Sequence, residues 1–317
     1  MREFTWGIAA TGGIARTVGA AIAAEPGMRV GAVGSRDLAR AQALASTLEA
    51  ESAYGSYERL CADPAIDAVY VATPHAQHLQ VAEAAIAAGK AVLCEKPLAA
   101  TVDDAEKMVR LAREAGVFLM EAMWMRFNPL IQQIAADPRF GELRSVQATF
   151  GFAAPYDPAH RLWAQELGGG ALLDLGIYPF SLAQLLLGTP SGLSFTGSLA
   201  PTGVDAEAAG TLLYPGGRHA LVAASLLGNY PNMASVVGTQ MRADIPAPFW
   251  APKRILLTGP SMEPEEHVLD PADNGYAGEL REVRAATAEG RTESSIMPLD
   301  ESLAMMGLLA DARRQLT

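Results

Sequence analysis

The sequence predicts an α/β fold, with an N-terminal doubly wound parallel sheet followed by an α+β part built on a large, open, mostly antiparallel sheet. Up to about residue 121, short apolar runs alternate with longer Ala-rich stretches that carry apolar residues at helical spacing. Such strand–helix–strand units with nearly all-apolar strands are typical of a parallel sheet covered on both faces. After residue 121, strand-like segments follow one another without helices between them, which is typical of an antiparallel sheet. We therefore expect two domains, 1–121 and 122–317.

In the first part, candidate strands alternate with candidate helices. Strands are expected at Thr5–Ala10, Met28–Val33, Ala68–Ala72, Ala91–Cys94 and Val117–Met120. Helices are expected at Ile14–Ala24, Leu38–Leu48, His78–Ala88 and Val102–Ala115. Glycines follow three of these helical stretches, as expected where helices end.

In the second part, strands predominate. They are expected at Ser145–Phe152, Ala208–Tyr214, His219–Leu226, Ala234–Thr239 and Arg254–Thr258, with a hairpin turn at Tyr214–Gly217. Helices are expected at Ala171–Leu187, Tyr276–Ala288 and Glu301–Leu316. If these helices cover one face of the sheet, the other face is open and favours self-association, so we expect a homodimer or a higher homo-oligomer.

Composition excludes several classes of protein. Half of the residues are hydrophobic and 19% are charged, which excludes a disordered chain. The formal charge of −11, without a basic cluster, argues against nucleic acid as a partner. No apolar run approaches 18 residues, so no membrane span is expected. Cys61 and Cys94 lie in apolar stretches and are interpreted as reduced core thiols of a cytoplasmic protein.

The turn after the first strand predicts a phosphate-binding loop. Ala10–Ala15 reads A-x-G-x-x-A, where a dinucleotide fold has G-x-G-x-x-G/A, and a helix begins there. Free N–H groups at the start of a helix bind phosphate. An ordinary tight turn is the alternative, but the position after the first strand of the series favours a nucleotide. The candidate contacts are Thr11, Gly12, Gly13 and Ile14.

The end of the second strand predicts which nucleotide binds. An NAD site carries a carboxylate about 20 residues after the glycines. This chain instead has Ser35 and Arg36 there, with Arg40 one helical turn further, and these groups suit a 2′-phosphate. Asp37 argues the other way, but at a helix start it is interpreted as an N-cap. We therefore expect NADP, with NAD as the alternative.

Three further motifs cluster at expected ligand-binding positions. Glu95-Lys96-Pro97 follows a buried strand, and Thr73-Pro74-His75-x-x-His78 follows the preceding one. In open α/β sheets this carboxyl edge binds ligands. Asp174-x-x-x-Tyr178 opens the long helix of the second part.

With these motifs the chain resembles the Gfo/Idh/MocA oxidoreductase family, most closely its branch of dimeric dihydrodiol dehydrogenases and NADP-dependent aldose (xylose-type) 1-dehydrogenases. The segments Glu121–Phe127 and Gly169–Asp174 carry the closer likeness. The resemblance implies a Rossmann domain over 1–121 and a substrate-binding and dimerisation domain over 122–317. It also implies a nicotinamide cofactor, with catalytic Lys96 and with Asp174 and Tyr178 beside the reacting hydroxyl. The expected cofactor contacts here are Thr73, Pro74, His75, His78, Glu95 and Lys96.

Two positions depart from the family pattern. Ala10 stands where the first glycine is common. The proline-rich segment Arg242–Pro252 looks like a substrate-edge insertion or a rearranged strand.

The expected chemistry is proton transfer coupled to hydride transfer. A free phenol has a pKa of about 10, and a cation about 4 Å away at an effective dielectric of about 20 contributes ~4 kcal/mol, near three pKa units. Our hypothesis is that Tyr178 is the acid/base, Lys96 lowers its pKa, and Glu95 or Asp174 orients them. The competing hypothesis makes Lys96 the proton shuttle.

Aromatic residues are candidates for a wall that binds the face of a sugar or a dihydrodiol, and plain core packing is the alternative for each. They are Trp124, Phe152, Trp163, Trp250 and Tyr276. Arg126 either faces the substrate or pairs with an acid. His75 and His78 lack a third ligand at usable spacing, so no metal is expected.

These observations predict an NADP-dependent oxidoreductase that acts on a small molecule, either a carbohydrate or a cyclic diol. A catalytically silent NAD(P)-binding regulator with the same fold is the alternative.

Overall fold

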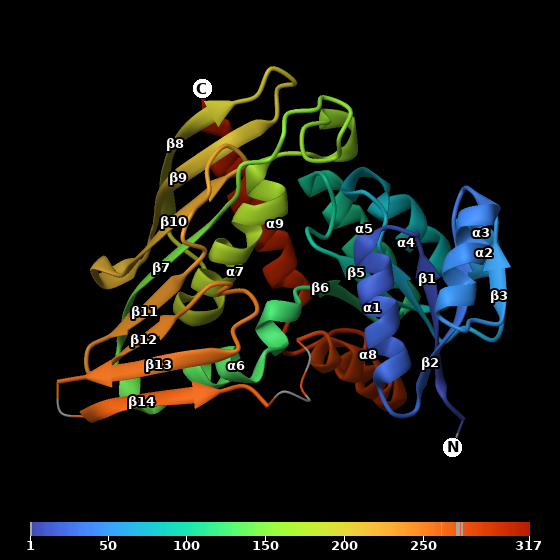
Figure 1. Ribbon diagram of the computed structural model, residues 1–317, viewed down its shortest axis with the longest axis horizontal. Helices are drawn as coiled ribbons and strands as arrows, with labels where there is room; N and C mark the ends of the chain where they lie inside the picture. The colour runs from blue at the N-terminus through green and yellow to red at the C-terminus, as the bar shows by residue number, and fades with distance from the viewer. Residues whose placement is uncertain (1, 261, 271–272, 274) are drawn as a thin grey trace. The chain divides into compact units, whose positions relative to one another are not determined.

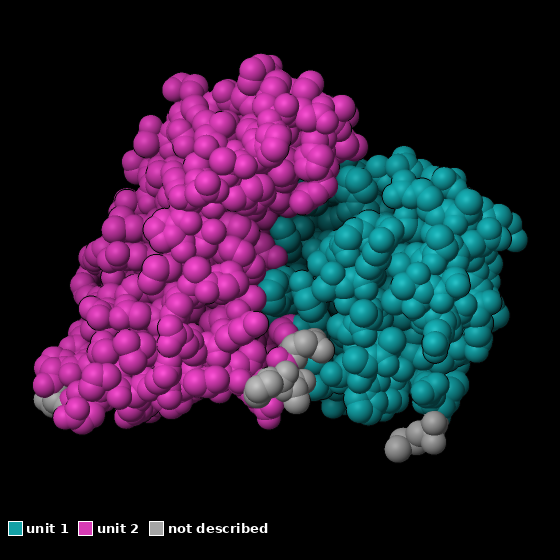
Figure 2. All heavy atoms as spheres, viewed as in Figure 1, with its two compact units in different colours: residues 1–124, 276–303 teal, residues 125–275, 304–317 magenta. Residues whose placement is uncertain are grey.

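The computed structural model describes residues 2–260, 262–270, 273 and 275–317. It divides into two compact units, coloured separately in Figure 2. Unit 1 comprises residues 1–124 and 276–303, and unit 2 comprises residues 125–275 and 304–317. The division at 121/122 stays a prediction. The compact units group the chain differently after residue 275, because a late segment returns to unit 1.

Unit 1 contains a six-stranded parallel sheet in the order β3-β2-β1-β4-β5-β6 (Figure 1). Its strands are β1 (Phe4–Ala9), β2 (Met28–Gly34), β3 (Ser52–Tyr54), β4 (Ala68–Val71), β5 (Ala91–Glu95) and β6 (Leu119–Ala122). Its α-helices include α1 (Gly13–Ala24), α2 (Leu38–Thr47), α3 (Tyr57–Cys61), α4 (His78–Ala87), α5 (Val102–Ala115) and α8 (Ala277–Glu289). Strands β4, β5 and β6 are buried throughout, as expected for a sheet with both faces covered.

Local sequence signals start and stop these helices. The side chain of Asp37 accepts hydrogen bonds from the backbone N–H groups of Ala39 and Arg40, which confirms the predicted N-cap of α2. Helix α5 begins at the Thr101 cap and ends at Gly116, which adopts the left-handed conformation.

The return of the chain to unit 1 places α8 beside α1. The sequence predicts a helix at Tyr276–Ala288 but assigns it to the second domain. The structure instead ties it to unit 1 through the ion pair of Arg281 with Glu25, at 2.9 Å. The backbone N–H of Leu119, in β6, also donates to the carbonyl oxygen of Thr292.

Unit 2 contains an eight-stranded sheet in the order β14-β13-β12-β11-β7-β10-β9-β8 (Figure 1). The strands are β7 (Leu143–Gly151), β8 (Gly192–Leu199), β9 (Asp205–Leu213), β10 (His219–Ser225), β11 (Ala234–Gly238), β12 (Arg242–Ile245), β13 (Arg254–Gly259) and β14 (Met262–Val268). Neighbouring strands pair antiparallel except β7 and β10, which pair parallel. The mostly antiparallel sheet and the hairpin turn at Tyr214–Gly217 are confirmed. The segment Arg242–Pro252 includes an inner strand, β12, and its interpretation as a substrate-edge insertion or a rearranged strand stays a prediction.

Helices of unit 2 lie on one face of this sheet, and the opposite face carries no helix in the described part of the chain (Figure 1). They are α6 (Pro129–Ala136), α7 (Ile177–Leu187), which continues a π-helical turn at Leu172–Gly176, and the larger part of α9 (Leu299–Arg314). The segment Gln165–Leu187 is long and apolar enough to pass a membrane-span test by length and composition. Of its most apolar window, 83% is buried within the protein, which is typical of a core helix.

Candidate active site

The loop between β1 and α1 offers backbone N–H groups to a ligand. Gly12 is the N-cap of α1; no side chain caps this helix and its first turn holds no acidic residue. A Cβ atom on Gly12 or Gly13 would meet nothing within 4 Å, so open space adjoins the helix start. Because a helix N-terminus attracts anions, this cradle fits the pyrophosphate of a dinucleotide. The loop would hold it through Thr11, Gly12, Gly13 and Ile14.

The backbone of Ala10 is strained in this loop. Its φ is +130°, in a region that glycine adopts freely and that L side chains rarely enter. Its backbone N–H donates to the carbonyl oxygen of Gly34 at 3.0 Å, which holds the strained residue against β2.

Two exposed cations follow the end of β2. Ser35 is buried and its hydroxyl accepts the N–H of Asp37 at 3.2 Å, whereas Arg36 and Arg40 are exposed. Both guanidinium groups lie near Tyr57, where burial raises the pKa of the phenol and the two cations act against that rise. Within the described ranges, neither arginine has a carboxylate ion-pair partner. They are thus available to an anionic ligand.

The Thr73–His78 segment divides into open and buried groups. Pro74 and His75 are partly exposed, while Thr73 is buried and its hydroxyl has no hydrogen-bond partner among the described residues. His78 is fully buried, and both of its ring nitrogens face backbone carbonyl oxygens. This corrects the prediction that His78 contacts the cofactor, since no ring atom is left open to a ligand. The orphan Thr73 hydroxyl remains a group that a bound nicotinamide nucleotide could satisfy.

Lys96 follows β5 above a buried acidic cluster. Glu95 receives hydrogen bonds from the hydroxyl of Tyr70 and from the backbone N–H of Lys96. Glu279, from the first turn of α8, is fully buried, and neither of its carboxyl oxygens has a hydrogen-bond partner in the described part of the chain. Burial, with the Glu95 charge, raises the pKa of Glu279 well above its ordinary range. Lys96 itself is partly exposed.

Two predicted aromatic residues meet in unit 1. The rings of Trp124 and Tyr276 lie 4.6 Å apart between centroids, at an interplanar angle of 34°.

In unit 2, Asp174 and Tyr178 lie on consecutive turns at the start of the long helix. Asp174 is 8% exposed at its side chain, and Arg161 holds it through two contacts of 2.9 and 3.4 Å. Sequence reasoning missed Arg161, because its loop shows no periodic pattern that would bring it to Asp174.

The aromatic group around Tyr178 differs in part from the predicted wall. Trp250 belongs to it, stacked on Phe150 at a centroid distance of 3.6 Å. The Tyr178 ring lies 5.7 Å from Phe150 and 6.0 Å from Trp250. Alternation along β7 could have indicated Phe150, which has the same parity as Phe152 but lies inside the strand.

Trp163 and Arg126 have structural roles instead, and Phe152 packs beside Trp163. Phe152 and the buried Trp163 pack into an apolar cluster with Leu162 and Leu175, and the Trp163 indole donates to the carbonyl oxygen of Pro155. Arg126 is fully buried and donates to Ser181 and Gln184 of α7, each at 3.0 Å. Burial of the Trp163 and Arg126 side chains corrects the prediction that these two contact substrate, whereas Phe152 is only partly buried and its substrate contact stays a prediction.

Comparison with known proteins identifies the family. Residues 4–123 match the Gfo/Idh/MocA oxidoreductase family model with its NAD-binding Rossmann fold, and residues 130–244 match the Gfo/Idh/MocA C-terminal domain. The chain belongs to the Gfo/Idh/MocA family. Its members are oxidoreductases, so the resemblance inferred from the motifs is confirmed, and so is the two-sheet fold.

Relatives within the Gfo/Idh/MocA family are similar over nearly the whole chain. Trans-1,2-dihydrobenzene-1,2-diol dehydrogenase from Mus musculus is 38% identical over 98% of this chain and 96% of its own. The enzyme of the same name from Danio rerio is 37% identical over the same shares. A 3-ketoreductase structure from Actinomadura kijaniata, in complex with NADP and TDP-benzene, has a TM-score of 0.87 at 28% identity and covers 99% of this chain and 98% of its own. An aldose-aldose oxidoreductase structure from Caulobacter crescentus has a TM-score of 0.88 at 26% identity, covering 99% and 97%.

As a Gfo/Idh/MocA member the protein is a nicotinamide-dependent oxidoreductase acting on hydroxyl or keto groups of a small molecule, as the sequence predicts. Within the described residues, no group of three or more His, Cys, Asp and Glu side chains is placed to hold a metal ion.

Proposed function

We propose that this protein is an NADP-dependent oxidoreductase that transfers a hydride between the nicotinamide and a hydroxyl or carbonyl carbon of a carbohydrate or cyclic diol. The observation that carries the substrate class is the group of three rings formed by Tyr178, Phe150 and Trp250. Stacked rings offer an apolar face that suits the C–H face of a ring-shaped substrate, beside a phenol that can exchange a proton. The dihydrodiol dehydrogenase relatives support the same class.

The preference for NADP rests on Ser35, Arg36 and Arg40 at the end of β2. Arg36 and Arg40 have no carboxylate partner among the described residues, so a 2′-phosphate would meet two available guanidinium groups. One charge-assisted hydrogen bond of about 1.5–3 kcal/mol corresponds to roughly 10–150-fold in affinity. We expect kcat/KM to favour NADP over NAD by at least tenfold and the Arg36→Ala variant to lose most of that preference. Equal kcat/KM values for the two cofactors would refute the assignment.

The proposed chemistry assigns a role to each of the motif residues Lys96, Asp174 and Tyr178. NADP⁺, when bound, supplies the hydride acceptor. Tyr178 takes the proton of the substrate hydroxyl, and Lys96 is the cation that assists this transfer. Glu95, or Asp174 held by Arg161, orients these two groups. In the competing version, Lys96 carries the proton itself.

The experiment is turnover measured by NADPH absorbance at 340 nm on a panel of aldoses, inositols and trans-diols. Lys96→Met and Tyr178→Phe should each lower kcat by about 10²-fold or more while NADP binding persists. Tyr156→Phe, at a half-exposed tyrosine, and Lys107→Met, at a surface lysine, are the matched controls. A Tyr178→Phe enzyme with full turnover would leave only the lysine version. Tight cofactor binding without turnover on any compound would favour the silent regulator.

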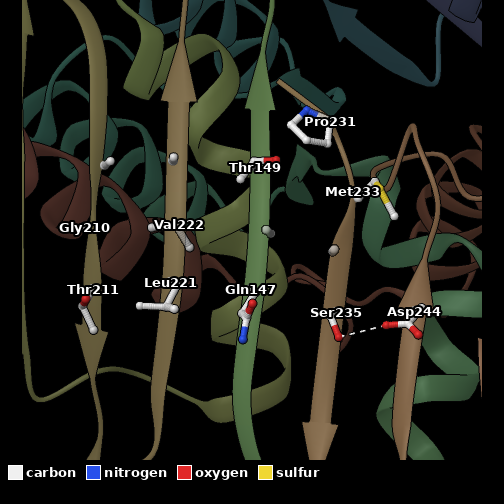
Figure 3. A pocket seen from close by; sticks show the side chains of 14 residues that line it. Gln147, Thr149, Gly210, Thr211, Leu221, Val222, Pro231, Met233, Ser235 and Asp244 are labelled. Atoms are coloured by element: carbon white, nitrogen blue, oxygen red, sulfur yellow. Dashed lines mark hydrogen bonds between the residues drawn. The ribbon is translucent and has the colours of Figure 1, made fainter. Parts of the chain in front are cut away.

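We also infer that a second copy of the chain covers the open face of the large sheet. A shallow hollow of about 690 Å³ lies on this face and is lined by residues of neighbouring strands, including Thr149, Thr211 and Ser235 (Figure 3). Leu221, which lines it, is 43% exposed. Water contact of this apolar surface favours association into a homodimer or a higher homo-oligomer.

A cytoplasmic location is the accompanying proposal. Cys61 and Cys94 are both buried and free, as expected of a protein that folds under reducing conditions.

A further inference from the structure

The loop that follows β5 carries Lys96, and one buried histidine makes hydrogen-bond contacts to the backbone of this loop. His78 is the first residue of α4, and its side chain is fully buried. Its Nδ1 lies 3.0 Å from the carbonyl oxygen of Pro97 and 3.3 Å from that of Leu98. Its Nε2 lies 2.9 Å from the carbonyl oxygen of Thr73. The ring therefore joins the segment after Lys96 to the end of the neighbouring strand, β4.

Other buried groups hold the same segment. The backbone N–H of Leu98 donates to the carboxylate of Glu121 at 2.9 Å, and the thiol of Cys94 lies 3.6 Å from the carbonyl oxygen of Leu98. If the segment shifted, these buried polar groups would lose their hydrogen-bond partners, each at a cost of about 1–3 kcal/mol. The backbone beside Lys96 is therefore fixed in one position.

The number of protons on the ring limits which contacts are hydrogen bonds. Burial lowers the pKa of His78 to about 4, so the ring is neutral at pH 7 and carries one N–H. Two carbonyl oxygens converge on Nδ1 and one on Nε2. If Nδ1 carries the proton, only the lone pair of Nε2 faces a carbonyl oxygen, which is one repulsive contact. If Nε2 carries the proton, the lone pair of Nδ1 faces two carbonyl oxygens, which makes two repulsive contacts.

We propose that His78 is a positioning residue for Lys96. The Nδ1–H of His78 donates to the carbonyl oxygens of Pro97 and Leu98 and so fixes the backbone from which the amine of Lys96 extends. The functional part of this inference rests on the proposed catalytic role of Lys96. An apolar side chain could fill the same core position. A buried imidazole, in contrast, costs free energy unless its hydrogen bonds are made, which argues that the tie itself is used.

Three substitutions separate the two ends of the ring. His78→Phe keeps a ring and removes both ties, His78→Asn keeps a donor near the Nδ1 position, and His78→Gln keeps one near the Nε2 position. We expect His78→Phe to lower kcat by about 10–100-fold, because a displacement of about 1 Å at a catalytic group costs up to about 100-fold in rate, with the Kd of NADPH changed less than about threefold. His78→Asn should recover more of kcat than His78→Gln.

Val81→Ala is the control, because Val81 is buried one turn further along the same helix. It should lower Tm as His78→Phe does and leave kcat within about twofold of the wild type. Amide hydrogen exchange gives a readout without turnover, because the amides of Lys96 and Leu98 should exchange faster in His78→Phe and not in Val81→Ala.

Each outcome bears on the proposal. Wild-type kcat with unchanged exchange at Leu98 in His78→Phe overturns it, and so does an equal loss of kcat in Val81→Ala. A better recovery by Gln than by Asn overturns the Nδ1 assignment. If Lys96→Met retains turnover, the proposed catalytic function fails. Exchange at Leu98 then still decides whether His78 holds the loop.

Discussion

Near the end of β5, the buried carboxyl group of Glu95 interacts with the buried carboxyl group of Glu279 from α8. Glu95 receives hydrogen bonds from Tyr70 and from the Lys96 backbone, while both oxygens of Glu279 lack them within the described residues. Like charges in a dry site cannot both ionise cheaply, so Glu279 holds a proton above the pH at which an exposed glutamate would lose it.

The raised pKa of Glu279 makes stability fall as pH rises. Below the ordinary glutamate pKa the group is protonated in both states and costs nothing. Above it the unfolded state loses the proton first, so the free energy of unfolding decreases until pH passes the folded pKa. Glu279→Gln should leave Tm nearly unchanged at pH 4 and raise it at pH 8 by at least about 2–4 °C, the shift expected for about 1 kcal/mol. Calorimetry across this range checks it. Glu114→Gln, at an exposed glutamate of α5, should show no such trend.

The strained Ala10 predicts an unusual gain from glycine. Ala10→Gly releases a backbone cost of about 1–3 kcal/mol at φ +130° against an entropic penalty of about 0.5–1 kcal/mol, so the free energy of unfolding should rise by about 1 kcal/mol. The same substitution at the exposed Ala20, inside α1, should lower it by about 1 kcal/mol. Urea titration of both variants compares the signs; two losses would contradict the strain argument.

At the residue scale, helix caps and sequence motifs were easier to predict than side-chain contacts between distant segments. Asp37 was recognisable as an N-cap because capping depends on neighbours within three residues. Arg161 and Phe150 were not recognisable as partners of Asp174 and Tyr178, because those contacts depend on how a loop and a strand fold back on the long helix. The catalytic roles of Lys96, Asp174 and Tyr178 remain predictions.

At the scale of elements, long periodic segments were predictable and short or edge segments were not. Strands β1, β2, β4 and β5 contain the continuous apolar runs of a buried parallel sheet, and each was expected near its observed bounds. Strand β3 and helix α3 have three and five residues, too few for a period to show. Strand β14 contains three glutamates and Pro264, which an edge strand tolerates and a central strand does not.

The start of the long helix of unit 2 depends on one glycine. Gly170 has φ +123°, and a Cβ there would lie 2.5 Å from Oδ1 of Asp205, whose carboxylate accepts the N–H of Leu172 at 2.6 Å. Gly170→Ala should lower the free energy of unfolding by about 2 kcal/mol or more and lower kcat, because Asp174 follows within one turn. Thermal unfolding and turnover measure the two effects.

Gly188 supplies the control at the opposite end of that helix. Its φ is +83° and a Cβ there would meet nothing within 4 Å, so Gly188→Ala carries the backbone cost without the clash. Equal losses in the two variants would contradict a role for Asp205.

At the scale of the whole molecule, the open sheet predicts self-association. Leu221 lies on that face between Thr211 and Gln147 (Figure 3), so Leu221→Glu should shift the protein toward monomer by burying an unpaired charge in the proposed contact. Light scattering over a concentration series measures the state. Leu38→Glu, at an exposed leucine of unit 1, should not change it. A wild-type chain that is monomeric throughout the series would contradict the proposal.

The order of the two sheets was readable from the sequence, but the membership of α8 was not. Apolar residues at helical spacing indicate that a helix packs on something and do not say on which sheet. The ion pair of Arg281 with Glu25 joins residues that are far apart in the sequence, and the residues around each give no sign that the two will pair.

That membership has a consequence for biosynthesis. A ribosome that has delivered residues 1–124 has made the nucleotide-binding half without its closing helix, because Tyr276–Leu303 belongs to the same unit. The nascent half must wait through translation of β7 to β14 before Thr292 emerges to meet Leu119. In this chain the first half to be synthesised is therefore among the last parts to be completed.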